Sequence, residues 1–173
     1  FATSNWETPF GFAMGSSGRT AISGYHYGPD LDLGTGKLDA KVDANAFVAV
    51  HDSAGAAVWA RTIGPSSAFE AAIAVAGSLD LGSAACPALA VTPASYGLAV
   101  LKLAAADGAC LGQTLLVPSK ATWVNLDSWK PGSIAVNASG VVAVTGAVVT
   151  SGVDTDVLVA RIDGTNVWQK VFA

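Results

Sequence analysis

Positive charge and long apolar runs are both scarce in this chain of 173 residues. Only 13% of the residues are charged, the nine Lys and Arg residues are scattered, and the net charge is −4. Nucleic acids and anionic membrane surfaces are recognised by clustered positive charge, so we expect neither as a partner. The longest apolar run, near 141–149, falls short of the roughly 18–20 residues that a membrane helix needs. We therefore expect no membrane insertion.

Residues that usually carry catalysis are also few. The histidines are His26 and His51, and the glutamates are Glu7 and Glu70. His51 precedes Asp52 at a strand end, where neighbouring side chains point to opposite faces, so the two cannot orient one another as a catalytic triad requires. Glycoside hydrolysis needs two acids that face each other across a cleft. The chain has only two glutamates, and most of its aspartates are placed at turns or strand ends, so no such pair is indicated. We expect no enzyme and no catalytic residue.

Metal and cofactor sites are not indicated either. The segment Asp30-Leu31-Asp32-Leu33-Gly34 faintly resembles a calcium loop, but it lacks a third acidic ligand and a terminal Glu. Its Leu-Asp-Leu-Gly core recurs at 79–82, which favours a repeated structural element. The prediction is that the chain holds no metal and no cofactor.

Cysteine is limited to Cys86 and Cys110. Their spacing fits neither a zinc pair nor a redox CxxC motif, and an even pair in a turn-rich chain favours one disulfide. The alternative is two inert buried thiols. A disulfide would indicate an exported protein.

Apolar residues and glycine are abundant, at 51% and 19 residues respectively. Glycines spread between short apolar runs are typical of one packed domain with many turns. No window keeps a 3.6-residue period with helix caps, whereas apolar residues alternate on both sides of the turns. The sequence therefore predicts an all-β fold.

Two hairpin patterns repeat along the chain. The run DTDVLVARIDGTNVWQKVFA at 154–173, with Trp168, matches NAFVAVHDSAGAAVWARTIG at 45–64, with Trp59. The run FGFAMGSSGRTAISGY near the start matches SIAVNASGVVAVTGA at 133–147. A weaker middle copy has Gly112 at the tryptophan position, and Gly24 to Gly77 spans the same number of positions as Gly55 to Gly108. The equivalent Trp59 and Trp168 are predicted to pack in the core.

These runs resemble the β-propeller repeat of large secreted or cell-surface bacterial proteins. In that repeat a strand ends in Thr/Ser-Gly, and an Asp-Xaa-Phe/Leu-Val-Ala strand, an Asp-Gly turn and a tryptophan strand follow. The resemblance implies about three four-stranded antiparallel blades, at roughly 9–64, 65–118 and 119–173, in one propeller-like domain or segment. It implies no fixed catalytic residues.

Three blades do not close a propeller of the usual four to eight. The chain begins Phe1-Ala2 and ends Phe172-Ala173, as if its start were the end of a preceding copy. We therefore expect the sequence to be part of a larger propeller. The alternatives are a ring completed by copies or partner chains, and a closure that differs from that of a normal propeller.

The aromatic residues outside the repeats are the candidate ligand-binding residues. Tyr25, His26 and Tyr27 are predicted to lie in a loop between strands, where ligand sites are often built. Trp123 and Trp129 flank another loop and offer a stacking platform for carbohydrate, or else they are buried between blades. Packing of the loop is the alternative for the first group.

The functional expectation follows from these points. The main hypothesis is a non-enzymatic structural or interaction scaffold of an exported, cell-surface or periplasmic bacterial protein. Its partners would be other proteins, or further copies or blades that complete the array. The second hypothesis is a carbohydrate-binding module that uses the loop aromatics, and the third is a fragment of a propeller enzyme.

Overall fold

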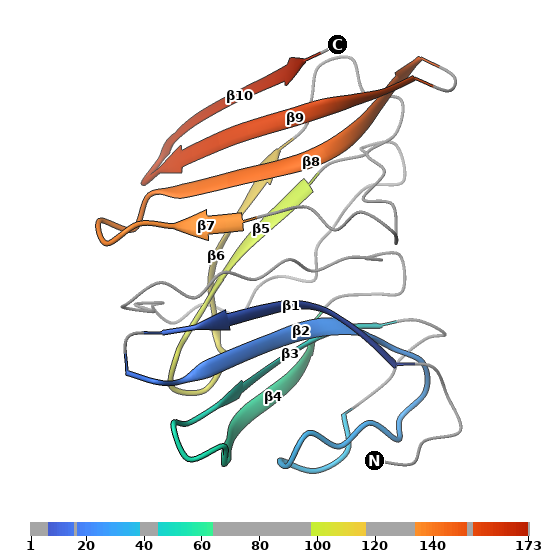
Figure 1. Ribbon diagram of the computed structural model, residues 1–173, viewed down its shortest axis with the longest axis vertical. Coiled ribbons are helices and arrows are strands. Elements are labelled where there is room, and N and C mark those ends of the chain that lie inside the picture. The colour runs from blue at the N-terminus through green and yellow to red at the C-terminus, as the bar shows by residue number, and fades with distance from the viewer. Residues whose placement is uncertain are drawn as a thin grey trace.

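The computed structural model describes residues 7–15, 17–38, 45–63, 98–116, 134–151 and 154–172. Within these ranges the chain forms ten β-strands and no helix, and every strand pair is antiparallel. The all-β prediction is confirmed. The strands form two four-stranded sheets and one two-stranded hairpin (Figure 1).

The N-terminal sheet is a meander in the order β1-β2-β3-β4. Its alternating residues make both faces apolar, as a sheet buried on two sides requires. Along β3, Phe47 and Ala49 point to one face while Val48 and Val50 point to the other, and all four are buried. Its strands are β1 (Glu7–Met14), β2 (Thr20–His26), β3 (Asn45–His51) and β4 (Ala57–Ile63).

The C-terminal sheet repeats this meander in the order β10-β9-β8-β7. Its strands are β7 (Ile134–Val136), β8 (Val142–Ser151), β9 (Asp154–Asp163) and β10 (Asn166–Phe172). The two sheets share one register, because Val50 pairs with Trp59 in the first and Arg161 pairs with Trp168 in the second.

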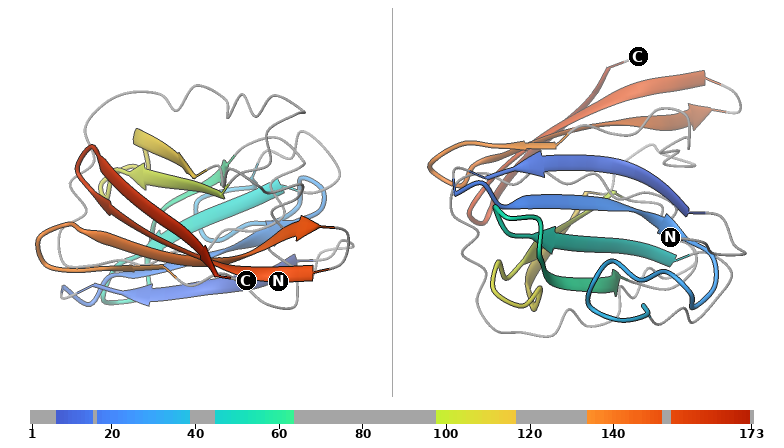
Figure 2. Two further views of the ribbon diagram at one scale, coloured as in Figure 1. Left: turned by 90° about the horizontal axis from the view of Figure 1, so that it is seen from above. Right: turned by 60° about the horizontal axis from the view of Figure 1, so that its bottom comes forward.

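The central hairpin, β5 (Leu98–Leu103) and β6 (Cys110–Leu116), joins the two sheets. Its turn end contributes Leu103 to a core cluster of the N-terminal sheet, and its open end contributes Leu116 to a core cluster of the C-terminal sheet. Figure 1 and the left view of Figure 2 show the hairpin lying to one side of β1 and β8, outside both sheets. Among the described residues no strand pairing joins the three pieces, and side-chain packing and side-chain hydrogen bonds connect them.

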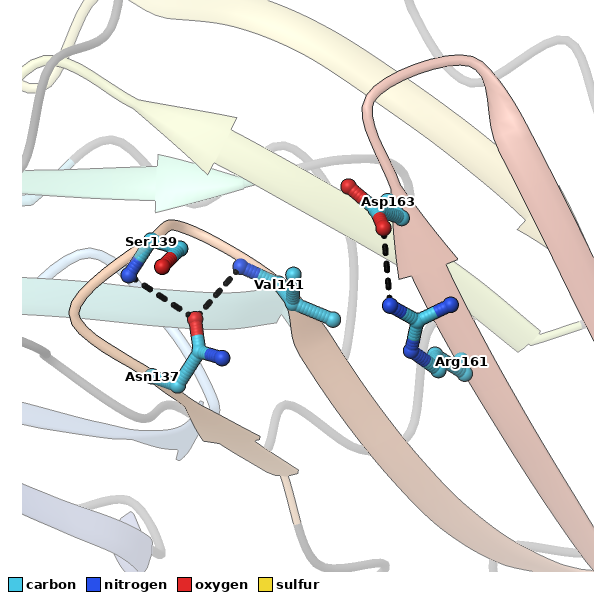
Figure 3. Close-up of polar contacts among 5 residues, drawn as sticks. All are labelled: Asn137, Ser139, Val141, Arg161 and Asp163. Carbon is cyan, nitrogen blue, oxygen red and sulfur yellow. Dashed lines mark hydrogen bonds and ion pairs between the residues drawn. The ribbon is translucent and has the colours of Figure 1, made fainter.

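Three hairpin turns have the same backbone geometry, at 15–19, 52–56 and 137–141. In each, the first and fifth residues pair and the glycine at the fourth position donates its N–H to the carbonyl of the first. That glycine has a positive φ in all three turns. In the second and third turns an Asp52 or Asn137 Oδ1 accepts two more backbone N–H groups, as Figure 3 shows for Asn137 with Ser139 and Val141. Short polar side chains stabilise such turns by this local capping.

Candidate functional site

The turn of the central hairpin, residues 104–109, docks on Trp59 of β4. The indole Nε1 donates a hydrogen bond of 3.0 Å to the carbonyl of Ala105. Gly108 lies against the indole ring so closely that a Cβ built on this glycine would lie 2.7 Å from two ring carbons. The contact explains why Trp59 is only 8% exposed.

Two arginines of the N-terminal sheet bind the same turn. Arg61 Nε donates to the carbonyl of Asp107 at 2.8 Å, and Arg19 donates to the carbonyl of Ala105 at 3.5 Å. The carbonyl groups of Ala105 and Asp107 accept these bonds. The hydrogen bonds within the turn use the N–H groups of Ala104, Gly108 and Ala109. Guanidinium donors form the stronger class of hydrogen bond, although Arg61 is exposed and its contribution is correspondingly modest.

The equivalent tryptophan of the C-terminal sheet is not buried. Trp168 is 50% exposed, so the prediction that it packs in the core is wrong. The cause is that the central hairpin covers opposite faces of the two sheets. In the N-terminal sheet the hairpin lies on the face that carries Val50 and Trp59. In the C-terminal sheet it lies on the face that carries Leu158 and Ala160, which is opposite to the face that carries Trp168.

The predicted aromatic loop at 25–27 is instead largely strand. Tyr25 and His26 end β2, and His26 is fully buried, which corrects its prediction as a loop residue. Its Nδ1 lies 2.9 Å from the carbonyl of Gly28 and its Nε2 lies 3.3 Å from the Thr62 hydroxyl. The ring also meets Phe47 edge-on, with centroids 6.1 Å apart. These contacts give His26 a packing role between β2 and β4.

The remaining candidate ligand residues are placed only in part. Tyr27 follows β2 and is half-buried, whereas Trp123 and Trp129 lie outside the described residues. The described part of the chain thus brings no aromatic platform together, and the ligand-binding role of these side chains stays a prediction.

His51 and Asp52 have separate partners. His51 Nε2 lies 3.2 Å from the carbonyl of Leu33, while Asp52 Oδ1 accepts the N–H groups of Ala54 and Ala56, each at 2.9 Å. The histidine anchors the loop that follows β2, and the carboxylate caps the β3–β4 turn.

The loop at 30–37 is stabilised by its own polar contacts. Asp32 Oδ1 accepts the N–H groups of Gly34 and Gly36, and Asp30 forms an ion pair with Lys37 at 2.9 Å. The hydrogen bond to Asp30, together with its charge, raises the pKa of the Lys37 ammonium. Among the residues that the structure describes, no three potential metal ligands gather.

Cys110 is buried at the start of β6, whereas Cys86 lies outside the described ranges. Their pairing stays a prediction.

Comparison with known proteins returned neither a matching family model nor a matching curated protein. Across the described strands and loops, nothing forms a helix with the length and hydrophobicity to cross a membrane.

The docking of a turn on Trp59 is not predicted by the repeat pattern. One signal was present in the sequence, because a basic residue follows each repeat tryptophan at the second position, Arg61 after Trp59 and Lys170 after Trp168. Arg61 binds the docked turn.

Proposed function

We propose that the chain is a non-enzymatic scaffold module whose blade-like units stack face to face, as in a propeller. The observation that carries the proposal is the placement of the central hairpin against opposite faces of two equivalent sheets. Each unit then presents one face to the preceding unit and the other to the following unit. Such stacking extends a series without new strand pairing, which is how repeat architectures bury their apolar faces.

The pattern of burial supports this stacking. In the N-terminal sheet the face of Ala21, Ser23, Val48 and Val50 is fully buried beneath the hairpin turn. The equivalent positions of the C-terminal sheet are Ala143, Thr145, Val159 and Arg161, of which Val159 is partly buried and the other three are exposed. A face that is apolar in one unit and partly apolar in the next is suited to contact with a further protein surface.

The location and partners of the scaffold are proposed from the repeat pattern. Because the repeats resemble those of secreted and cell-surface bacterial propellers, we place the protein outside the cytoplasm. Its partners are proteins, or further copies or blades that continue the array. Specificity would be supplied by segments that do not repeat, such as 25–42, 81–96 and 119–131.

Three measurements test this function. Antibodies against the chain should label intact producing cells from outside. A glycan array should give no signal, and panels of ester, glycoside and peptide substrates should show no turnover. Glycan binding that is lost on Trp123→Ala or Trp129→Ala, but kept in Phe12→Ala, would instead establish the carbohydrate-binding alternative. Turnover by the purified chain would contradict the scaffold.

A further inference from the structure

One face of the C-terminal sheet combines exposed apolar and basic side chains. Val157, Trp168 and Phe172 are each about half exposed, and Arg161 and Lys170 lie on the same face by strand alternation. Lys170 lies over the Phe172 ring, 4.9 Å from its centroid, and Arg161 pairs with Asp163 at 2.7 Å (Figure 3). We call these five residues the Trp168 face.

The Trp168 face has the same pattern as the surface of the N-terminal sheet that already binds a hairpin turn. Trp168 lies across from Arg161, as Trp59 lies across from Val50, and Lys170 lies across from Val159, as Arg61 lies across from Val48. In the N-terminal sheet, the tryptophan and the basic residue two positions later each donate a hydrogen bond to a carbonyl of the docked turn. The Trp168 face thus offers an equivalent pair of donors, an indole N–H and a basic side chain, together with the apolar surface of the indole ring.

A turn of the right kind is exposed at the other end of the molecule. The β3–β4 turn, Asp52 to Ala56, resembles the docked turn of the central hairpin but is one residue shorter, because Asp52 pairs with Ala56 whereas Ala104 pairs with Ala109. Gly55, like Gly108, lies immediately before the residue that closes its turn. Both glycines have a positive φ, of 82° and 70°. Gly108 is covered by the Trp59 ring, whereas among the described residues no atom lies within 4 Å of a Cβ built on Gly55.

The two surfaces also have opposite charge. The Trp168 face carries two exposed cations, of which Arg161 is partly neutralised by Asp163. The β3–β4 turn contains Asp52. The adjoining loop contains Asp32, and it is joined to β3 by the hydrogen bond between His51 and Leu33. Opposite charges favour this encounter, whereas two Trp168 faces would bring four cations together.

We propose that the Trp168 face binds the β3–β4 turn of a second copy of this chain. The indole N–H of Trp168 and the ammonium of Lys170 donate to carbonyls of that turn, and Gly55 lies against the indole ring. The contact joins two different surfaces, so it propagates head to tail and produces a closed ring or an open chain of copies. This inference rests on the proposed scaffold function and adds to it the partner and the contact.

The first test is sedimentation velocity of the whole chain over a wide concentration range. We expect reversible association, weakened at least about tenfold by Trp168→Ala, which corresponds to about 1.4 kcal/mol. Ala54→Arg should weaken it similarly by placing a cation against Lys170, and adding Lys170→Asp to that variant should restore it. Phe12→Ala is the control, because Phe12 is a 67% exposed aromatic residue on β1, away from both surfaces.

A second test fixes the geometry. An oxidised mixture of Ala54→Cys and Lys170→Cys chains should give a disulfide-linked heterodimer. A mixture of Ala54→Cys with Gln169→Cys should not, because adjacent strand residues point to opposite faces.

The outcomes separate this inference from the scaffold function. A chain that stays monomeric at every concentration overturns the inference, while the labelling, glycan and turnover results still decide the function. Association that is unaffected by Trp168→Ala overturns the site. Association that is weakened by Trp168→Ala but not by Ala54→Arg, without the expected cross-link, overturns the turn as its occupant.

Discussion

Trp59 covers Gly108 so closely that the indole ring lies in the space that a side chain at position 108 would need. The glycine belongs to the turn of the central hairpin and the tryptophan to the N-terminal sheet, 49 positions apart in the numbering. Because Gly108 also has a positive φ of 70°, glycine is required there for both backbone and contact reasons. This contact couples two units of the chain.

Gly108→Ala should destabilise the protein more than Gly55→Ala. Both substitutions place a Cβ on a left-handed residue, which costs about 1–2 kcal/mol. Only the first also forces a methyl group into the Trp59 ring, and such overpacking adds about 1–3 kcal/mol. Urea denaturation of the two variants measures the difference. Equal losses of stability would show that the turn does not press on the indole.

The two repeat tryptophans should respond differently to truncation. Trp59→Ala removes a buried ring and should cost about 3–5 kcal/mol of unfolding free energy, whereas Trp168→Ala should stay within about 0.5 kcal/mol for the monomer. Trp59→Phe retains much of the packing but loses the bond to Ala105, which is worth about 1 kcal/mol. Denaturation below the concentration at which copies associate gives these values. A large monomer effect at Trp168 would contradict its exposed position.

Thr62→Val should destabilise the N-terminal sheet by removing the hydroxyl partner of His26. The histidine is fully buried, and loss of a buried hydrogen-bond partner costs about 1–3 kcal/mol. Thr165→Val, in the exposed β9–β10 turn, is the matched control and should be close to neutral. Thermal or urea unfolding checks both. If Thr62→Val were as harmless as the control, the bond to His26 would have no part in stability.

The capping side chains of the repeated turns should tolerate exchange of Asp and Asn but not truncation. Asp52→Ala and Asn137→Ala each remove an Oδ1 that accepts two backbone N–H groups, and each should cost about 1 kcal/mol. Asp52→Asn and Asn137→Asp keep that oxygen and should lose much less. The comparison is again made by chemical denaturation, and equal effects of Ala and of the conservative residue would argue against capping.

Much of the fold follows from local patterns. Alternating apolar residues around Gly55 and Gly164 predict the β3–β4 and β9–β10 hairpins, since a strand has a period of two and a sharp turn needs glycine or a capping Asp. The repeated FGFAMGSSGRTAISGY and SIAVNASGVVAVTGA patterns likewise correspond to the β1–β2 and β7–β8 hairpins. The prediction of a loop is wrong for Tyr25 and His26, because polar aromatic residues are compatible with a strand when, like His26, they find partners on another strand of the sheet.

Strand, turn and repeat positions are local properties, because they depend on the period of the side chains and on the backbone freedom of single residues. These local patterns in the amino-acid sequence were therefore sufficient to predict an all-β chain and to identify Trp59 and Trp168 as equivalent. Which of the two is buried is not a local property, because it depends on which face of each sheet the central hairpin covers. That hairpin comes from a different part of the chain, and its packing leaves the Trp168 face exposed.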